Sequence, residues 1–207
     1  MSLLNLLIPA FTGFVFMIPV LMLWFHHLHR SGHSVSRLHQ AGVYLFCYYL
    51  FGVWFLTGMG PLQRFEPDLS LLPSADLLHG TVDTILNVIL FVPLGMFLPM
   101  LWRRFHRFSP VVTAGVLVSL LIETLQMFGL GITDINDLIT NTLGTCAGYG
   151  LYRLLAHWMP ENAARQFQQS PVSGRTAVML AVTTSLLMTM YIQKPVLKWL
   201  VSMITGG

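Results

Sequence analysis

The chain has 207 residues, of which 55% are hydrophobic and only 9% are charged. Soluble globular domains carry roughly 25% charged residues, so this composition excludes an ordinary water-soluble domain and favours a membrane protein. The formal net charge of +3 is too small to indicate a nucleic-acid partner.

A membrane-spanning helix needs about 20 mostly apolar residues, and six segments of the chain meet or nearly meet this requirement. In chain order they are roughly residues 3–25, 41–60, 83–102, 110–128, 138–158 and 176–193. The last segment is the least regular, because Lys194 and Pro195 interrupt its end. We therefore predict an all-α, polytopic transmembrane helical bundle with about six spans.

The basic residues are divided unequally between the two sides of this predicted bundle. Alternate loops, beginning with the one after the first segment, contain eight arginines, and the other side contains three basic residues. The two sets are Arg30, Arg37, Arg103, Arg104, Arg107, Arg153, Arg165 and Arg175, against Arg64, Lys194 and Lys198. Because loops rich in Lys and Arg stay in the cytoplasm, we expect both termini to be extracytoplasmic.

Three of the predicted helices carry polar residues near their outer ends, three or four positions apart. These residues are Asp83 and Asn87 in the third helix, Ser119, Glu123 and Gln126 in the fourth, and Asp137 and Asn141 in the fifth, with Asp134 just before it. Residues three or four apart lie on one helix face, and a charged carboxylate inside a membrane costs roughly 3 kcal/mol. We therefore expect the three faces to turn toward each other and to enclose a polar pocket on the outer side.

Two glycines extend the polar stripe of the fifth helix toward the cytoplasm. Gly144 and Gly148 form a GxxxG pattern, which allows two helix backbones to approach closely in a membrane. This pattern predicts tight packing that closes the polar pocket from below.

The polar residues have structural explanations as well as functional ones. Amide side chains such as Asn87, Gln126 and Asn141 can serve only as hydrogen bonds between helices, and Asp134 can cap the fifth helix. Glu123 is harder to explain in this way, because a carboxylate within a span usually marks a functional site. We assign candidate catalytic roles to Glu123, Asp137 and Asp134, and ligand-binding roles to Asn87, Ser119, Gln126, Asn141 and Asp83. Whether a metal or another cofactor is bound stays open.

Several of these features occur in an order that resembles the VanZ-like family of bacterial membrane proteins. One element reads N-x-x-x-F-x-P-x-G, and a second reads S-x-x-x-E-x-x-Q followed by spaced Asp, Asn and Gly residues. The matching residues are Asn87, Phe91, Pro93, Gly95, Ser119, Glu123, Gln126, Asp134, Asp137, Asn141, Gly144, Gly148 and Tyr149. The resemblance covers roughly residues 43–155.

The resemblance implies a division of the chain into three regions. Residues 41–158 would form a four-helix membrane core, residues 1–40 an extra N-terminal helix with a histidine-rich cytoplasmic loop, and residues 159–207 a cytoplasmic linker with a C-terminal helix. It also implies the cytoplasmic (inner) membrane as the location. The family takes its name from a protein that confers low-level resistance to the glycopeptide teicoplanin, so an influence on glycopeptide susceptibility is expected.

Three kinds of function fit these observations. The pocket could bind or modify an envelope lipid or glycan component, in a protein surrounded by membrane lipids. The chain could instead be a non-catalytic assembly partner, or a homo-oligomer, that packs through the surface of Gly144 and Gly148. A proton-coupled transporter or flippase with Glu123 as its relay is the third. We favour the first, and whether the protein is an enzyme stays open.

Five histidines lie within the first predicted cytoplasmic loop, namely His26, His27, His29, His33 and His39. Structural zinc sites use four ligands, commonly with cysteine among them, and no cysteine or carboxylate accompanies these histidines. We therefore favour a pH-sensitive loop at the membrane interface over a metal site.

Overall fold

The computed structural model describes residues 3–70, 82–168 and 170–193, and in addition residues 195, 196, 199 and 202; of residues 3–11 and of Asp83 it describes the backbone. The long helices are α1 (Leu3–Arg30), α2 (Arg37–Leu56), α4 (Val82–Leu101), α5 (Phe108–Gln126), α6 (Ile135–Trp158) and α8 (Gly174–Met188). The shorter elements are β1 (Leu69–Ser70), η1 (Arg103–Phe105), β2 (Thr133–Asp134), α7 (Glu161–Phe167) and the π-helix η2 (Thr189–Gln193). The predicted all-α class is confirmed.

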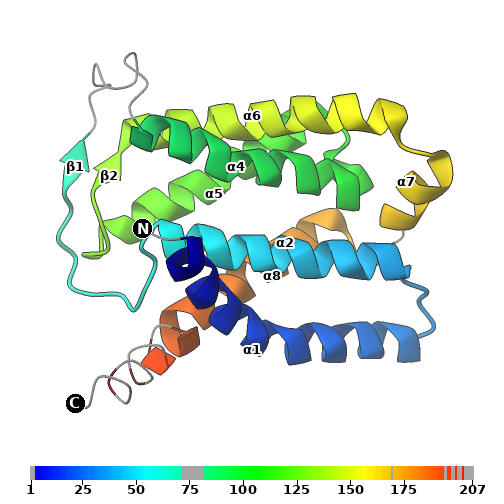
Figure 1. The fold of residues 1–207 in the computed structure, drawn as a ribbon, viewed down its shortest axis with the longest axis horizontal. Helices are drawn as coiled ribbons and strands as arrows, with labels where there is room; N and C mark the ends of the chain where they lie inside the picture. The colour runs from blue at the N-terminus through cyan, green and yellow to red at the C-terminus, as the bar shows by residue number, and fades with distance from the viewer. Residues whose placement is uncertain are drawn as a thin grey trace.

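The six long helices form two groups of three (Figure 1). α4, α5 and α6 pack together in one group, with α4 and α6 in the most extensive contact, and α1, α2 and α8 form the other. Contacts between α2 and α4 join the two groups. The order of the helices in space therefore differs from their order in the chain, because α8 returns to complete the group that α1 and α2 begin.

Four stretches in the described part of the chain are long and apolar enough to cross a membrane. They are Thr12–Arg30, Thr84–Leu101, Phe108–Gln126 and Gly174–Gln193. The prediction of about six spans is therefore wrong for two helices, α2 and α6. α2 opens with Arg37, His39 and Gln40, and α6 carries its polar stripe, so neither is apolar enough for its length.

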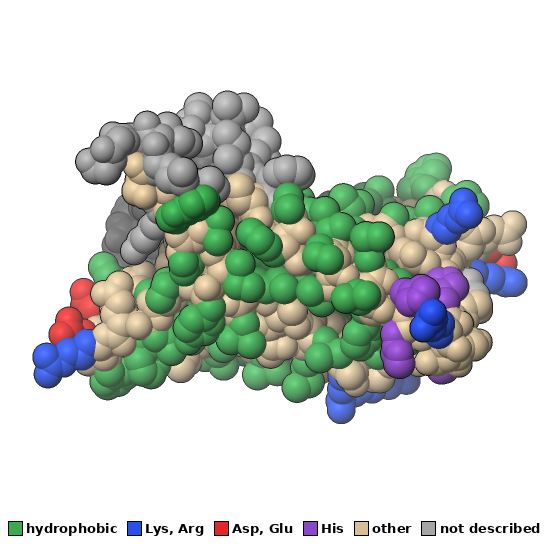
Figure 2. All heavy atoms as spheres, turned by 90° about the horizontal axis from the view of Figure 1, so that it is seen from below, with side chains coloured by type: hydrophobic (Ala, Val, Ile, Leu, Met, Phe, Trp, Pro, Cys, Tyr) green, Lys and Arg blue, Asp and Glu red, His purple; other side chains and the backbone are tan. Residues whose placement is uncertain are grey.

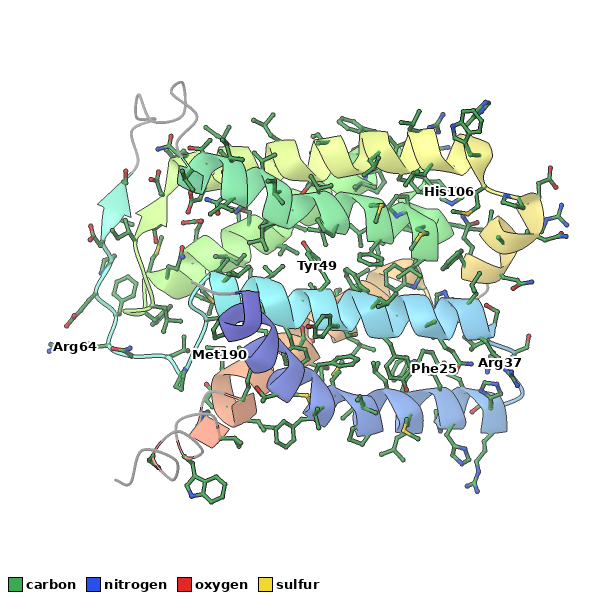
Figure 3. The ribbon with its side chains drawn as sticks, in the orientation of Figure 1. Phe25, Arg37, Tyr49, Arg64, His106 and Met190 are labelled. Atoms are coloured by element: carbon green, nitrogen blue, oxygen red, sulfur yellow. The ribbon has the colours of Figure 1, made fainter. Side chains whose placement is uncertain are left out.

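Charged and apolar side chains occupy different parts of the surface (Figure 2). Hydrophobic side chains cover the middle of the face that is shown, whereas Lys, Arg, Asp, Glu and His side chains lie toward its two ends. The side-chain view places Arg37 and His106 at one end of the molecule and Arg64 at the opposite end (Figure 3). A bundle with an apolar middle and charged ends suits a lipid bilayer.

α2 lies at the centre of the contacts between the groups. Its residues Phe46, Leu50 and Trp54 are completely buried. Two hydrogen bonds connect it to its neighbours. The Tyr49 hydroxyl donates to the backbone oxygen of Leu90 on α4 at 2.8 Å, and the Trp54 indole donates to Ser185 Oγ on α8 at 2.9 Å. Buried aromatic surface and these two bonds together tie α4 and α8 to α2.

Glycines bring α4 and α6 into backbone contact. A Cβ atom at Gly144 would lie 2.2 Å from the backbone oxygen of Val88, and one at Gly148 would lie 2.0 Å from that of Val92. On the facing helix, a Cβ at Gly95 would lie 2.0 Å from the backbone oxygen of Thr145. The close packing predicted from the GxxxG pattern is therefore confirmed, and the helix that fills this surface is α4 of the same chain.

Two loops come together at the end opposite α7. β1 and β2 pair in parallel, with Leu69 opposite Thr133 and Ser70 opposite Asp134. Three residues before β1, the backbone N–H of Glu66 donates to the backbone oxygen of Met127 at 3.0 Å. This pairing holds the start of α6 beside the end of α5, where the polar residues are found.

Candidate functional site

The polar stripe of α5 faces the interior of the α4–α5–α6 group. Ser119 is completely buried, Glu123 is 5% exposed and Gln126 is 9% exposed. One turn before Ser119, a Cβ atom at Gly115 would lie 2.4 Å from Thr145 Oγ1 on α6. The inner end of this helix face, at Gly115, therefore packs directly on α6. The side chains of Ser119 and Glu123 lie in the same interface between α5 and α6. Glu123 does not point at lipid.

Glu123 is held at the start of α6. Its Oε2 atom accepts a hydrogen bond from the backbone N–H of Asp134 at 2.9 Å, and the Thr133 hydroxyl donates to the backbone oxygen of Glu123 at the same distance. The N-terminus of a helix carries unpaired N–H groups and a positive partial charge, both of which favour a carboxylate. The fold therefore gives this buried carboxyl a fixed position and a favourable field.

Asp134 caps α6. Its Oδ1 atom accepts a hydrogen bond from the backbone N–H of Asn136 at 2.8 Å, and its backbone is extended, with φ −122° and ψ 127°. This geometry confirms the structural explanation considered for Asp134. One side-chain oxygen of Asp134 is thus hydrogen-bonded to the first turn of α6.

Two pairs of polar side chains connect α6 to its neighbours. Asn87 Nδ2 on α4 donates to Asp137 Oδ1 at 2.6 Å, and Asn141 Nδ2 donates to Ser119 Oγ on α5 at 2.9 Å. Asp137 and Asn141 lie one turn apart on α6, so the two pairs are at neighbouring depths. The structure therefore brings Asn87, Ser119, Asp137 and Asn141 together across three helices, as the spacing predicted.

Gln126 and Asp83 stand apart from these pairs. The Gln126 side chain lies under the turn that precedes β2, because a Cβ atom at Gly131 would be 3.2 Å from its Nε2. Gln126 is therefore close to the site but at its outer edge. The side chain of Asp83, which the sequence also assigned to ligand binding, lies outside the described residues.

Three buried oxygen atoms at the site have no hydrogen-bond partner among the described residues. They are Glu123 Oε1, Gln126 Oε1 and Asn141 Oδ1. Buried polar atoms are nearly always paired, and an unpaired one costs about 1–3 kcal/mol. All three atoms are hydrogen-bond acceptors, so the partners that they lack within the described ranges are donors.

A metal would be one way to supply positive charge to such oxygens. Among the residues whose side chains the structure describes, no group of three or more His, Cys, Asp or Glu residues is arranged to hold a metal ion. The acceptor oxygens of Glu123, Asn141 and Gln126 are better suited to hydroxyl, amide or ammonium groups, which present between one and three hydrogen-bond donors.

The histidines do not form the loop that the sequence predicted. α1 continues to Arg30 and includes His26, His27 and His29, so only His33 remains in the loop. His39 is buried in the first turn of α2, and its Nδ1 atom lies 2.6 Å from the backbone oxygen of Phe167 at the end of α7. The bounds of the predicted histidine loop are therefore wrong, because the residues on both sides of it belong to helices, whereas its place at the membrane interface stays a prediction.

Another contact at the same end was not predicted. The Gln168 amide donates to His106 Nε2 at 2.6 Å, and the Tyr149 hydroxyl donates to the backbone oxygen of His106 at 2.8 Å. His39 thus contacts the last residue of α7, and His106 contacts the residue that follows it. No spacing rule links these residues, because their contacts join parts of the chain more than forty positions apart.

Comparison with known proteins adds the family context for this site. A family model described as VanZ/LLP1 matches residues 11–156, which include every residue of the site. Protein VanZ of Enterococcus faecium is 41% identical to this chain over 69 residues, which are 33% of this chain and 42% of that protein. The matched region is thus less than half the length of that relative. No solved structure matches the chain.

Proposed function

Because this chain belongs to the VanZ/LLP1 family, we propose that it acts in the bacterial cell envelope, where the Glu123 site binds a lipid-linked or glycan component. The observation that carries this proposal is a set of acceptors that have no partner among the described residues, Glu123 Oε1, Gln126 Oε1 and Asn141 Oδ1. Sugar hydroxyls, amide N–H groups and ammonium groups supply the donors that these atoms lack. Envelope precursors are rich in all three kinds of group.

The proposed orientation puts this site on the extracytoplasmic side of the cytoplasmic membrane. Arg37 and the helix end at Arg30 lie at the end of the molecule opposite Arg64 (Figure 3). The arginine-rich end is cytoplasmic by the usual distribution of basic residues. Both the start of α1 and the end of η2 then lie on the extracytoplasmic side, as does the β1–β2 pair beside the site (Figure 1).

Glu123 is the carboxyl group that we assign to any reaction at the site. One oxygen of Asp134 caps α6 and one oxygen of Asp137 accepts from Asn87. Glu123 Oε2 accepts from the Asp134 N–H, whereas Glu123 Oε1 has no partner in the part of the chain that the structure describes. A carboxylate that is anchored through one oxygen and open at the other is suited to accept a proton from a bound hydroxyl or amine.

Two other functions are less well supported. An assembly partner that docks through Gly144 and Gly148 would need this surface to be open, yet α4 of the same chain covers it. A flippase or proton-coupled transporter would need a polar path that continues toward the arginine-rich end. There the contacts of Gly95 and Gly148 bring α4 and α6 together at backbone distance, which leaves no room for a ligand to pass between these two helices.

The first prediction tests ligand binding at Glu123. In Glu123→Gln the side chain keeps its volume but loses its negative charge, and a hydrogen bond to a charged group contributes about 1.5–3 kcal/mol. We expect the amount of envelope lipid or glycan that co-purifies with the full-length variant to be about tenfold lower than with the wild type. Mass spectrometry of both proteins, extracted from bacterial membranes at equal abundance, measures this amount.

The matched control is Thr124→Ala, which alters an exposed neighbour on the opposite face of α5. This variant should retain the wild-type amount. Teicoplanin susceptibility of the expressing strain should follow the retained ligand. Equal retention and equal susceptibility for wild type and Glu123→Gln, at equal abundance, would refute the proposal.

A further inference from the structure

A groove lies on the other side of α5, between α5 and α8. These two helices belong to different three-helix groups, and the groove of about 570 Å³ opens where the groups diverge. Ligand sites in proteins have volumes of about 300–1,000 Å³. The groove therefore has room for a lipid chain and is distinct from the Glu123 site, which faces α6.

The groove is polar at one end and apolar along the rest of its length. Arg104 and Ser109 line it near the start of α5, and Arg175 lines it at the start of α8. Farther along both helices the lining is aliphatic, formed by Leu117, Leu121, Val118, Val178, Met179 and Val182. This polarity matches a lipid, whose charged headgroup stays at the membrane surface while its chain extends toward the membrane centre.

The two arginines are brought together by the packing of α8 on η1. A Cβ atom at Gly174 would lie 2.8 Å from Trp102 Cβ and 3.3 Å from Arg104 Cβ, so the start of α8 is in close contact with η1. Arg175 follows Gly174 directly, and both arginines are exposed. No acidic residue lines the groove among the described residues.

The helix ends add to the positive field of the arginines. α5 and α8 both begin at this end of the groove. The N-terminus of a helix carries a partial positive charge and unpaired N–H groups, which favour phosphate. Arginine binds phosphate through two parallel N–H bonds. The groove therefore combines four features that attract one anionic headgroup.

We propose that the α5–α8 groove binds an anionic phospholipid of the leaflet at the arginine-rich end, with its phosphate between Arg104 and Arg175 and one acyl chain along the aliphatic lining. The lipid would fill the gap between the two helix groups. This site takes a bulk membrane lipid as its ligand, whereas the Glu123 site takes an envelope component from the opposite side.

The test measures binding of phosphatidylglycerol and phosphatidylcholine to the full chain by native mass spectrometry. Each arginine at a membrane surface contributes roughly fivefold to the affinity for an anionic lipid. We therefore expect Arg104→Gln with Arg175→Gln to weaken phosphatidylglycerol binding by about 25-fold and to leave weak phosphatidylcholine binding unchanged. Higher salt should reduce the difference between the two lipids in the wild type.

Arg30→Gln with Arg37→Gln is the matched control, because it removes the same charge from the same end of the molecule outside the groove. A second variant pair tests the acyl chain. Ala114→Phe fills the groove and should lower binding of both lipids, whereas Ala147→Phe, on an exposed position of α6, should not.

Two results would overturn the proposal. One is equal phosphatidylglycerol affinity in the Arg104/Arg175 variant and in the Arg30/Arg37 control. The other is full lipid binding by Ala114→Phe. The melting temperature in detergent serves as the folding check, since the Arg104/Arg175 variant should leave it unchanged and Ala114→Phe should still unfold in a cooperative transition. Failure of the groove proposal and failure of the Glu123 proposal are therefore separate outcomes.

Discussion

At the scale of single residues, the polar cluster depends on two hydrogen bonds, one from Asn141 to Ser119 and one from the Asp134 N–H to Glu123. The separation of Ser119 from Glu123 predicts a shared face, and both side chains are buried together as expected. Spacing says nothing about partners, so the bond from Asn141 to Ser119 and the anchoring of Glu123 on the Asp134 N–H required the structure. Whether these residues bind a ligand stays a prediction.

The second prediction concerns the hydrogen bond between α5 and α6. Ser119→Ala removes the acceptor of the Asn141 amide inside the bundle. Measured side-chain hydrogen bonds between membrane helices contribute about 0.6 kcal/mol on average and up to about 1.7 kcal/mol. We expect a loss of unfolding free energy in this range when the variant is denatured from detergent micelles.

Thr124→Ala provides the comparison, because the Thr124 hydroxyl is exposed and donates to the Leu120 backbone oxygen of its own helix. Its effect on stability should be close to zero. If both variants lose the same stability, the bond between Ser119 and Asn141 contributes nothing specific.

At the scale of helices, the apolar runs of the sequence predicted the positions of all six long helices. The residue at which a helix begins depends on local capping hydrogen bonds, which the apolar runs do not show. α2 begins at Arg37 because Ser36 Oγ accepts the His39 N–H at 3.0 Å, four residues before the apolar run starts. α7, η1 and the pairing of β1 with β2 were not predicted. They have no long apolar run, and the β1–β2 pairing joins loops about sixty positions apart.

The third prediction uses two glycines of α6 that differ in their surroundings. A Cβ atom at Gly148 would lie 2.0 Å from the Val92 backbone oxygen, whereas one at Gly150 would meet nothing within 4 Å. Overpacking of a close contact costs about 1–3 kcal/mol, and replacing Gly with Ala in a helix interior stabilises by about 0.5–1 kcal/mol. Gly148→Ala should therefore lower the melting temperature, and Gly150→Ala should leave it unchanged or raise it.

Thermal unfolding of both variants in one detergent measures this difference. A melting temperature for Gly148→Ala at or above that of Gly150→Ala would show that α4 and α6 are farther apart than described.

At the scale of the whole molecule, the two ends differ in chemistry. One end presents the Glu123 site and the paired loops, and the other presents arginines, α7 and two histidines that contact the last residue of α7 and the residue after it. The sequence predicted the division of charge between the ends. It did not predict the two three-helix groups, because helical periodicity shows which face is apolar but not which helix covers it.

The fourth prediction is a dependence of stability on pH at the arginine-rich end. Burial lowers the pKa of His106 from its ordinary value, and Arg103 and Arg153 lower it further, while a backbone hydrogen bond at Pro99 acts in the opposite direction. The Gln168 amide donates to His106 Nε2, which must be unprotonated to accept.

A base with a lowered pKa binds fewer protons in the folded state than in the unfolded state. Its contribution is therefore complete above its ordinary pKa of 6.5 and is lost as the pH falls through the lowered value. Wild-type protein should melt at a lower temperature at pH 5 than at pH 7.5, and His106→Gln should show a smaller difference. The same pH dependence in both proteins would exclude His106 as its source.

The bond between Trp54 and Ser185 has a consequence for biosynthesis. The indole of Trp54 is buried against a helix that the ribosome delivers about 130 residues later. α4, α5 and α6 are consecutive and can assemble as soon as they are synthesised. The group of α1, α2 and α8 stays incomplete until α8 has been synthesised. Until then the translocation machinery, a chaperone or lipid has to cover the surface of α2 that later packs against α8.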